Sequence, residues 1–167
     1  MIKMNIFKKI NNFFNKLNVI AFIILMTIIT YILNILLASI FLKITNVSPS
    51  ASYGTIEMSI TGLIFPLIIS PWTETILFQS FIFYIFSNIK KFNYPIVKLL
   101  ISTLCFGLFH AIYNPYYAIS AFAVGIIFAY SYLLYEKKNS SPIKVTALIH
   151  AGNNAIAIFL PIIITKL

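Results

Sequence analysis

Three ionisable side chains lie inside long apolar runs of this 167-residue chain: Glu74, His110 and His150. They include both histidines and one of only three acidic residues, whereas Glu57 lies at the edge of an apolar run and Glu136 in a polar segment. In a membrane helix, a charged side chain at mid-depth costs about 2.5–3.5 kcal/mol on insertion scales, and such residues are usually functional. A carboxylate and two imidazoles are groups that perform general acid–base chemistry.

The neighbours of the two histidines follow helical spacing. Phe106 and His110 are four residues apart, as are His150 and Asn154, so each pair shares one helix face, with Asn153 adjacent. If the three helices pack together, the polar side chains converge on one pocket: Glu74, His110, His150 and Asn154. A carboxylate base with imidazole and carboxamide donors at the oxyanion can hydrolyse an amide through an activated water. Hydrogen bonding between membrane helices explains the same residues equally well.

The elements that must position these residues are membrane helices. The chain is 60% hydrophobic and only 9% charged, whereas a soluble domain is about one quarter charged. So much apolar surface also excludes a disordered chain. Because about 20 apolar residues cross a bilayer, the length allows five or six helices. We therefore predict an all-α, polytopic transmembrane helical bundle.

The apolar runs divide the chain into three parts. Residues 1–18 are basic, with apolar side chains at helical spacing, and predict a cytoplasmic amphipathic helix at the membrane surface. Residues 19–42 form an uninterrupted apolar run, which predicts an anchoring transmembrane helix. Residues 55–164 form the core, in which we expect four helical runs: 55–87, 95–113, 116–135 and 142–164.

The lysines predict the topology of the core. Pro66 and Pro71 interrupt the run 55–87, and we expect residues 55–70 to be partly re-entrant or to lie at the surface. If 55–87 crosses the membrane once, the chain crosses five times, and only Lys43 and Lys166 lie outside. The other ten lysines are then cytoplasmic, as the positive-inside rule favours: Lys3, Lys8, Lys9, Lys16, Lys90, Lys91, Lys98, Lys137, Lys138 and Lys144.

The charge composition indicates a lipid bilayer as the partner rather than nucleic acid. Twelve lysines, no arginine and three acids give a net charge of +9. The lysines lie in small groups at the ends of apolar runs, which is typical of membrane anchoring, whereas a nucleic-acid site needs a clustered basic patch. Exclusive use of lysine, with abundant Ile and Asn, is typical of an AT-rich genome. We expect a multi-pass protein of a bacterial cell membrane with a cytoplasmic N-terminus.

At the ionisable residues the sequence resembles a known family. Three motifs stand in order: Glu74-Thr75-Ile76-Leu77-Phe78-Gln79, then Phe106-Gly107-Leu108-Phe109-His110, then His150-Ala151-Gly152-Asn153-Asn154. They are similar to the Glu-Glu-x-x-x-Arg, Phe-x-x-x-His and His-x-x-x-Asn motifs of the CAAX protease and bacteriocin-processing (CPBP, or Abi) family of intramembrane endopeptidases. The resemblance covers roughly residues 55–160. The second and third motifs match the family pattern, whereas the first matches it only at Glu74.

The resemblance implies a fold of one anchoring helix plus a four-helix CAAX-protease-like core, and it implies a role for each residue. Glu74 activates the water and His110 assists, while His150 and Asn154 form the oxyanion site. The supporting positions are Thr75, Gln79, Phe106 and Asn153; Thr75 replaces the second Glu of the family and Gln79 replaces its Arg. The implied substrate is a peptide or membrane-associated protein, such as a bacteriocin or signalling-peptide precursor, cleaved near the cytoplasmic side.

The departures from the family leave an alternative function open. With neither a second Glu nor an Arg, the chain is also explained as an inactive relative that acts as a bacteriocin-immunity protein or a membrane scaffold. A small transporter subunit, using the polar cluster as a proton relay, is disfavoured because the sequence shows no inverted repeat.

A metal is the other chemical possibility at this site. Two His and one Glu could hold Zn²⁺ with an open water position, and members of the family have been labelled metalloproteases. However, the His-Glu-x-x-His motif is absent, and the resemblance implies a glutamate-dependent mechanism. We therefore expect no cofactor and no required metal. No Ser in the deep apolar runs has a nucleophile motif around it.

Overall fold

The computed structural model describes residues 2–46, 59–112 and 115–165, and within these ranges every regular element is a helix. The elements, in chain order, are α1 (Ile2–Lys16), α2 (Val19–Thr45), α3 (Ile60–Ile64), η2 (Phe65–Ile69), α4 (Ser70–Glu74), η3 (Thr75–Phe81), α5 (Ile82–Ser87), α6 (Pro95–Ala111), α7 (Pro115–Lys137) and α8 (Pro142–Ile164). The predicted all-α membrane bundle is confirmed.

Four of these helical segments are long and apolar enough to cross a membrane: Val19–Ile44, Ile60–Ser87, Tyr117–Lys137 and Pro142–Ile164. The fifth apolar helix, α6, has 17 residues, which is at the lower limit for a span. The helix ends follow local signals. Asn18 begins α2 by accepting a hydrogen bond from the Ala21 N–H, and Asn46 ends it in a left-handed conformation at φ 56°.

The segment Ile60–Ser87 differs from the expectation that residues 55–70 turn back or lie at the surface. From residue 60 onward it is one continuous helical segment, in which two π-helical stretches, η2 and η3, alternate with α-helical turns. Pro66 and Pro71 each lie in the first turn of a new stretch, so the changes between α and π turns coincide with the missing backbone N–H of each proline. Residues 55–58 lie outside the described residues.

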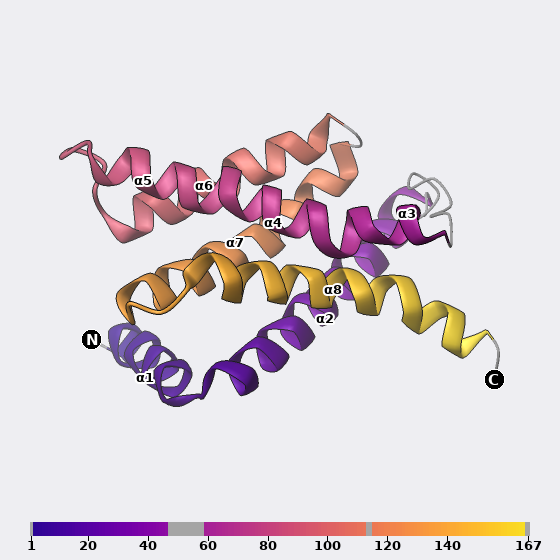
Figure 1. The fold of residues 1–167 in the computed structure, drawn as a ribbon, viewed down its shortest axis with the longest axis horizontal. Helices are drawn as coiled ribbons and strands as arrows, with labels where there is room; N and C mark the ends of the chain where they lie inside the picture. The colour runs from indigo at the N-terminus through magenta and orange to yellow at the C-terminus, as the bar shows by residue number, and fades with distance from the viewer. Residues whose placement is uncertain (1, 47–58, 113–114, 166–167) are drawn as a thin grey trace.

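The helices alternate in direction, so their connections gather at two ends of the bundle. Figure 1 shows α1, the turn after α5 and the α7–α8 turn at one end, with the C-terminal ends of α2 and α8 at the other. The lysines of α1, of residues 88–98 and of residues 137–144 thus share one end, whereas Lys43 lies at the opposite end. This arrangement agrees with a single crossing by Ile60–Ser87; Lys166 lies outside the described residues.

Close helix packing holds the middle of the bundle together. α6 packs along α7, and α2 packs along both α7 and α8. A Cβ on Gly107 would lie 3.1 Å from the Cβ of Phe122, and one on Gly125 would lie 3.2 Å from Phe106. These glycines permit the close approach of α6 and α7 that their small size predicts. The buried cluster draws on four helices, α2, α6, α7 and α8, and includes Phe22, Met26, Phe106, Phe128 and Ile149.

Candidate active site

Glu74 lies at the middle of the long helical segment and faces the bundle interior. Its side chain is 14% exposed, and the Ser70 hydroxyl, one turn earlier, donates a hydrogen bond to Oε1. The other oxygen, Oε2, is buried and has no hydrogen-bond partner among the described residues. It lies 3.7 Å from His110 Nε2 and 4.0 Å from His150 Nε2. The structure therefore brings together the three ionisable side chains that the sequence places in apolar runs.

His110 is oriented by its own helix. Its Nδ1 lies 2.8 Å from the carbonyl oxygen of Phe106, one turn earlier in α6. Because a carbonyl only accepts, Nδ1 carries the proton of this hydrogen bond; when the ring is neutral, Nε2 is then the acceptor that faces Glu74. The ring also packs against Tyr117, with centroids 5.1 Å apart. The imidazole thus has one fixed direction toward the carboxylate.

His150 is held by aromatic packing. Its ring stacks on Phe128 of α7, with centroids 4.7 Å apart and an interplanar angle of 28°. Phe106 lies between the two histidines, 4.4 Å from the ring of His110 and 6.0 Å from that of His150. Phe106 therefore packs against both imidazoles, and its role as a supporting residue stays a prediction.

Asn153 and Asn154 take part in a different set of contacts. Asn154 Nδ2 donates to the carbonyl oxygen of Pro66 at 2.8 Å, and Asn153 Nδ2 donates to Asn154 Oδ1 at 3.3 Å. Asn34 of α2 donates to Asn153 Oδ1 at 3.1 Å, a hydrogen bond between two apolar helices. The structure thus places Asn154 on α8 one turn beyond His150, bound to the proline-containing part of the long helix.

Thr75 and Gln79 do not orient Glu74 in this structure. Both are fully buried, at 0% and 1% exposure. Thr75 Oγ1 and Gln79 Nε2 have no hydrogen-bond partner among the described residues. Ser70 orients the carboxylate instead, and sequence reasoning missed it. The available signal was its spacing, four residues before Glu74 on the same helix face.

A cavity of about 310 Å³ adjoins the carboxylate and His110. Its surface is mostly apolar with a few polar side chains, which is typical of a binding site. It is lined by Phe65, Ser70, Thr73, Glu74, Leu77, Phe78, Phe109 and His110. Side chains of the long helix and of α6 therefore shape the space beside the ionisable cluster.

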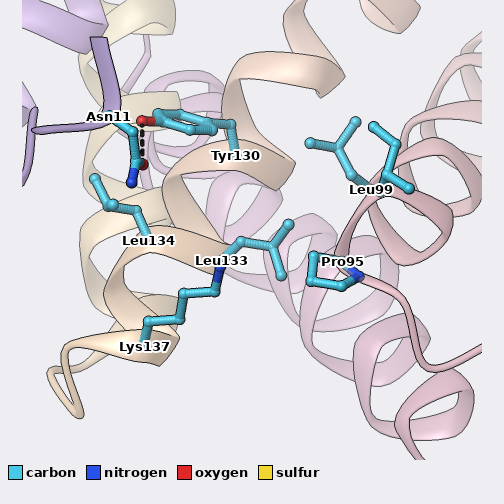
Figure 2. A pocket seen from close by; sticks show the side chains of 8 residues that line it. Asn11, Pro95, Leu99, Tyr130, Leu133, Leu134 and Lys137 are labelled. Atoms are coloured by element: carbon cyan, nitrogen blue, oxygen red, sulfur yellow. Dashed lines mark hydrogen bonds between the residues drawn. The ribbon is translucent and has the colours of Figure 1, made fainter. Parts of the chain in front are cut away.

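A second cavity, of about 250 Å³, lies between α1, α6 and α7 at the lysine-rich end (Figure 2). Leucines and Pro95 line it, and Tyr130 donates a hydrogen bond to Asn11 Oδ1 at 3.1 Å on its rim, near Lys137. It shares no lining residue with the cavity beside Glu74. It contains none of the side chains that the sequence identifies as catalytic candidates.

The donor set around Glu74 has the composition of a zinc site. Within residues 2–46, 59–112 and 115–165, however, no three His, Cys, Asp or Glu side chains form a group that could hold a metal ion. That the reaction requires no metal stays a prediction.

One comparison with known proteins matches this region. The family model described as type II CAAX prenyl endopeptidase Rce1-like matches residues 56–156, more than half of the chain. The matched range contains Glu74, both histidines and Asn154, and it leaves out α1 and α2. Neither the curated proteins nor the solved structures give a match.

Proposed function

The chain belongs to the Rce1-like family of type II CAAX prenyl endopeptidases, and on this basis we propose that it hydrolyses a peptide bond in the membrane with a water that Glu74 activates. The observation that carries the proposal is the environment of Glu74 Oε2. This oxygen is buried without a hydrogen-bond partner among the described residues and faces two imidazole nitrogens at 3.7 and 4.0 Å.

The geometry suits a water between the carboxylate and the imidazoles. With Nδ1–H of His110 donating to Phe106, both His110 Nε2 and Glu74 Oε2 are acceptors, and 3.7 Å is too long for a direct hydrogen bond. A water that donates one hydrogen to each satisfies both groups. Its oxygen lone pair is then free to attack a carbonyl carbon.

The reaction follows general-base catalysis. Glu74 accepts a proton from the water as the new C–O bond forms, and the carbonyl oxygen becomes an oxyanion. His150 in its Nε2–H form, together with Asn154, donates to that oxyanion. When the C–N bond breaks, the proton on Glu74 passes to the leaving amine. The balance is one water consumed, one peptide bond broken and the carboxylate regenerated.

The substrate is a peptide or membrane-associated protein. The cavity beside Glu74 has walls formed by Phe65, Leu77, Phe78 and Phe109, which fit an apolar side chain next to the cleaved bond. Secreted-peptide precursors, such as those of bacteriocins or signalling peptides, have apolar segments of this kind. Cleavage near the cytoplasmic side stays a prediction from the sequence, because Glu74 lies at the middle of the segment Ile60–Ser87.

A specific observation favours a second candidate, a non-enzymatic immunity or scaffold protein. Thr75 and Gln79 occupy the two positions at which the family motif has a second Glu and an Arg. Each has a polar atom without a hydrogen-bond partner among the described residues. In that case the fold binds a peptide without cleaving it. Glu74→Gln separates the two functions, because only an enzyme requires the carboxylate of Glu74.

The test compares the N-termini of cellular peptides in three strains with equal amounts of membrane-inserted protein. One strain carries the wild type, one carries Glu74→Gln, and the control carries Glu136→Gln, a glutamate exposed at the end of α7. We expect new N-termini with the wild type and the control, and none with Glu74→Gln. Identical profiles in all three strains, with the cellular phenotype retained, would support the non-enzymatic function.

A further inference from the structure

Three carboxamide side chains connect α2 to the proline-containing part of the long helix. Asn34 Nδ2 donates to Asn153 Oδ1 at 3.1 Å, and Asn153 Nδ2 donates to Asn154 Oδ1 at 3.3 Å. Asn154 Nδ2 then donates to the carbonyl oxygen of Pro66 at 2.8 Å. We refer to Asn34, Asn153 and Asn154 as the carboxamide series.

The series ends on a carbonyl that the helix itself cannot satisfy. In η2 the Ser70 N–H donates to the Phe65 carbonyl, which is π-helical spacing. At the same spacing the donor for the Pro66 carbonyl is residue 71, and Pro71 has no N–H. An unpaired carbonyl is costly away from water. Asn154 supplies the missing donor from α8.

The Pro66 carbonyl fixes the direction of every amide in the series. Because this carbonyl only accepts, Asn154 must turn its NH₂ group toward it and its Oδ1 toward Asn153. Asn153 then has to donate to Asn154, and its own Oδ1 faces Asn34. Asn34 therefore has to be the first donor. One hydrogen of Asn154 Nδ2 is used by Pro66, and the second is left for another acceptor.

We propose that Asn34 is a positioning residue for the site around Glu74, an inference that rests on the function proposed above. Donation by Asn34 to Asn153 completes the series, so Asn34 and the Pro66 carbonyl together hold the Asn154 amide in the orientation that leaves its second N–H for the oxyanion. It also anchors the Pro66–Pro71 region, which contains Ser70 and is followed within one turn by Glu74. Asn34 lies in α2, outside the residues 56–156 that match the family, so the first membrane helix contributes to catalysis.

The test uses substitutions that change the donor and a control on the same helix. Asn34→Leu removes both polar atoms, and Asn34→Asp keeps the shape but replaces the NH₂ group. The control is Thr30→Val, one turn earlier, because the buried Thr30 hydroxyl donates within α2 to the Met26 carbonyl at 2.7 Å. Each protein is purified in lipid vesicles, and kcat and KM are measured per folded protein with a peptide identified by N-terminal profiling.

We expect both Asn34 variants to lose about tenfold to 100-fold in kcat with KM within about threefold of wild type. Thr30→Val keeps the wild-type kcat. Asn34→Leu combined with Asn153→Leu loses no more than the larger single loss, because both break the same series. If Asn34 affects only stability, the losses of Asn34→Leu and Asn153→Leu add in the double variant. Those losses then vanish when activity is expressed per folded protein.

Two results overturn the inference, and they are distinguishable. If Glu74→Gln abolishes cleavage but Asn34→Leu keeps the wild-type kcat, Asn34 is not a positioning residue and the proposed function stands. If Glu74→Gln cleaves as the wild type does, the proposed function fails, and the inference fails with it.

Discussion

The two oxygens of Glu74 have different surroundings, and this difference defines the chemistry proposed for the site. Oε1 accepts from the Ser70 hydroxyl, while Oε2 faces His110 and His150 without a partner among the described residues. One oxygen is thus held in place, and the other is available to a water. In the family motif a second Glu and an Arg follow, whereas here Thr75 and Gln79 are buried, and Thr75 Oγ1 and Gln79 Nε2 have no hydrogen-bond partner among the described residues.

Ser70→Ala tests whether the hydroxyl orients the carboxylate. A hydrogen bond to a charged group contributes about 1.5–3 kcal/mol, so its loss should lower kcat about tenfold to 100-fold with KM little changed. The matched control is Ser131→Ala, because the Ser131 hydroxyl donates to the Ile127 carbonyl of its own helix at 2.8 Å and lies outside the cavity. Equal kcat values for Ser70→Ala and Ser131→Ala would contradict the role of Ser70.

Metal removal tests the prediction that the chain's own side chains perform the reaction. We expect the cleavage rate of purified protein to be unchanged after prolonged treatment with a strong zinc chelator, because no step of the proposed mechanism passes through a metal. The measurement is the rate before chelation, after chelation and after addition of Zn²⁺. Loss of activity that Zn²⁺ restores would contradict the prediction.

At the scale of the elements, the contact between α2 and α8 holds the third motif in place. A Cβ on Gly152 would lie 2.9 Å from both Oγ1 and Cγ2 of Thr27. Gly152 is followed directly by Asn153 and Asn154, so this close approach brings Asn34 within reach of the carboxamides. The helix predicted as an anchor is therefore packed against the predicted core.

Gly152→Ala should destabilise the protein by about 1–3 kcal/mol, because the β-branched Thr27 side chain cannot move aside freely. Thr27→Ala removes both contacting atoms, and the double variant should recover most of the lost stability. The measurement is the midpoint of thermal unfolding in detergent, with Ala157→Val on the exposed side of α8 as the control. No recovery in the double variant would show that the contact does not carry the effect.

The sequence predicts the helices well and their continuity poorly. Long apolar runs between lysine groups predict α2, α7 and α8, because apolar length alone decides what can span a bilayer. The continuity of Ile60–Ser87 depends on π turns and on a donor from α8 to the Pro66 carbonyl. That donor comes from packing between distant segments, which hydropathy does not report.

The site shows the same division between what sequence predicts and what packing decides. Glu74, His110 and His150 are predictable because ionisable groups in apolar runs are costly and rare. Ser70 is not, because serines are common in membrane helices and its importance depends on the direction of the Glu74 side chain. The hydrogen bond from Asn154 to the Pro66 carbonyl likewise depends on how α8 packs against the long helix.

At the scale of the whole molecule, the alternating helices place the described lysines other than Lys43 at one end (Figure 1). The positive-inside rule then predicts that this end, with α1, is cytoplasmic. Single cysteines test this in a Cys105→Ser background: Asn88→Cys, Asn139→Cys and Asn46→Cys. A membrane-impermeant maleimide should label only Asn46→Cys in intact cells, and labelling of Asn139→Cys there would contradict the topology.

The most direct test of the central claim is the single-turnover rate of peptide cleavage by purified protein in lipid vesicles, comparing the wild type with Glu74→Gln. Loss of a general base costs about 10²–10⁴-fold, and we predict a loss in this range, with Glu136→Gln at the wild-type rate. Cleavage by Glu74→Gln at the wild-type rate would contradict the claim that Glu74 activates the water.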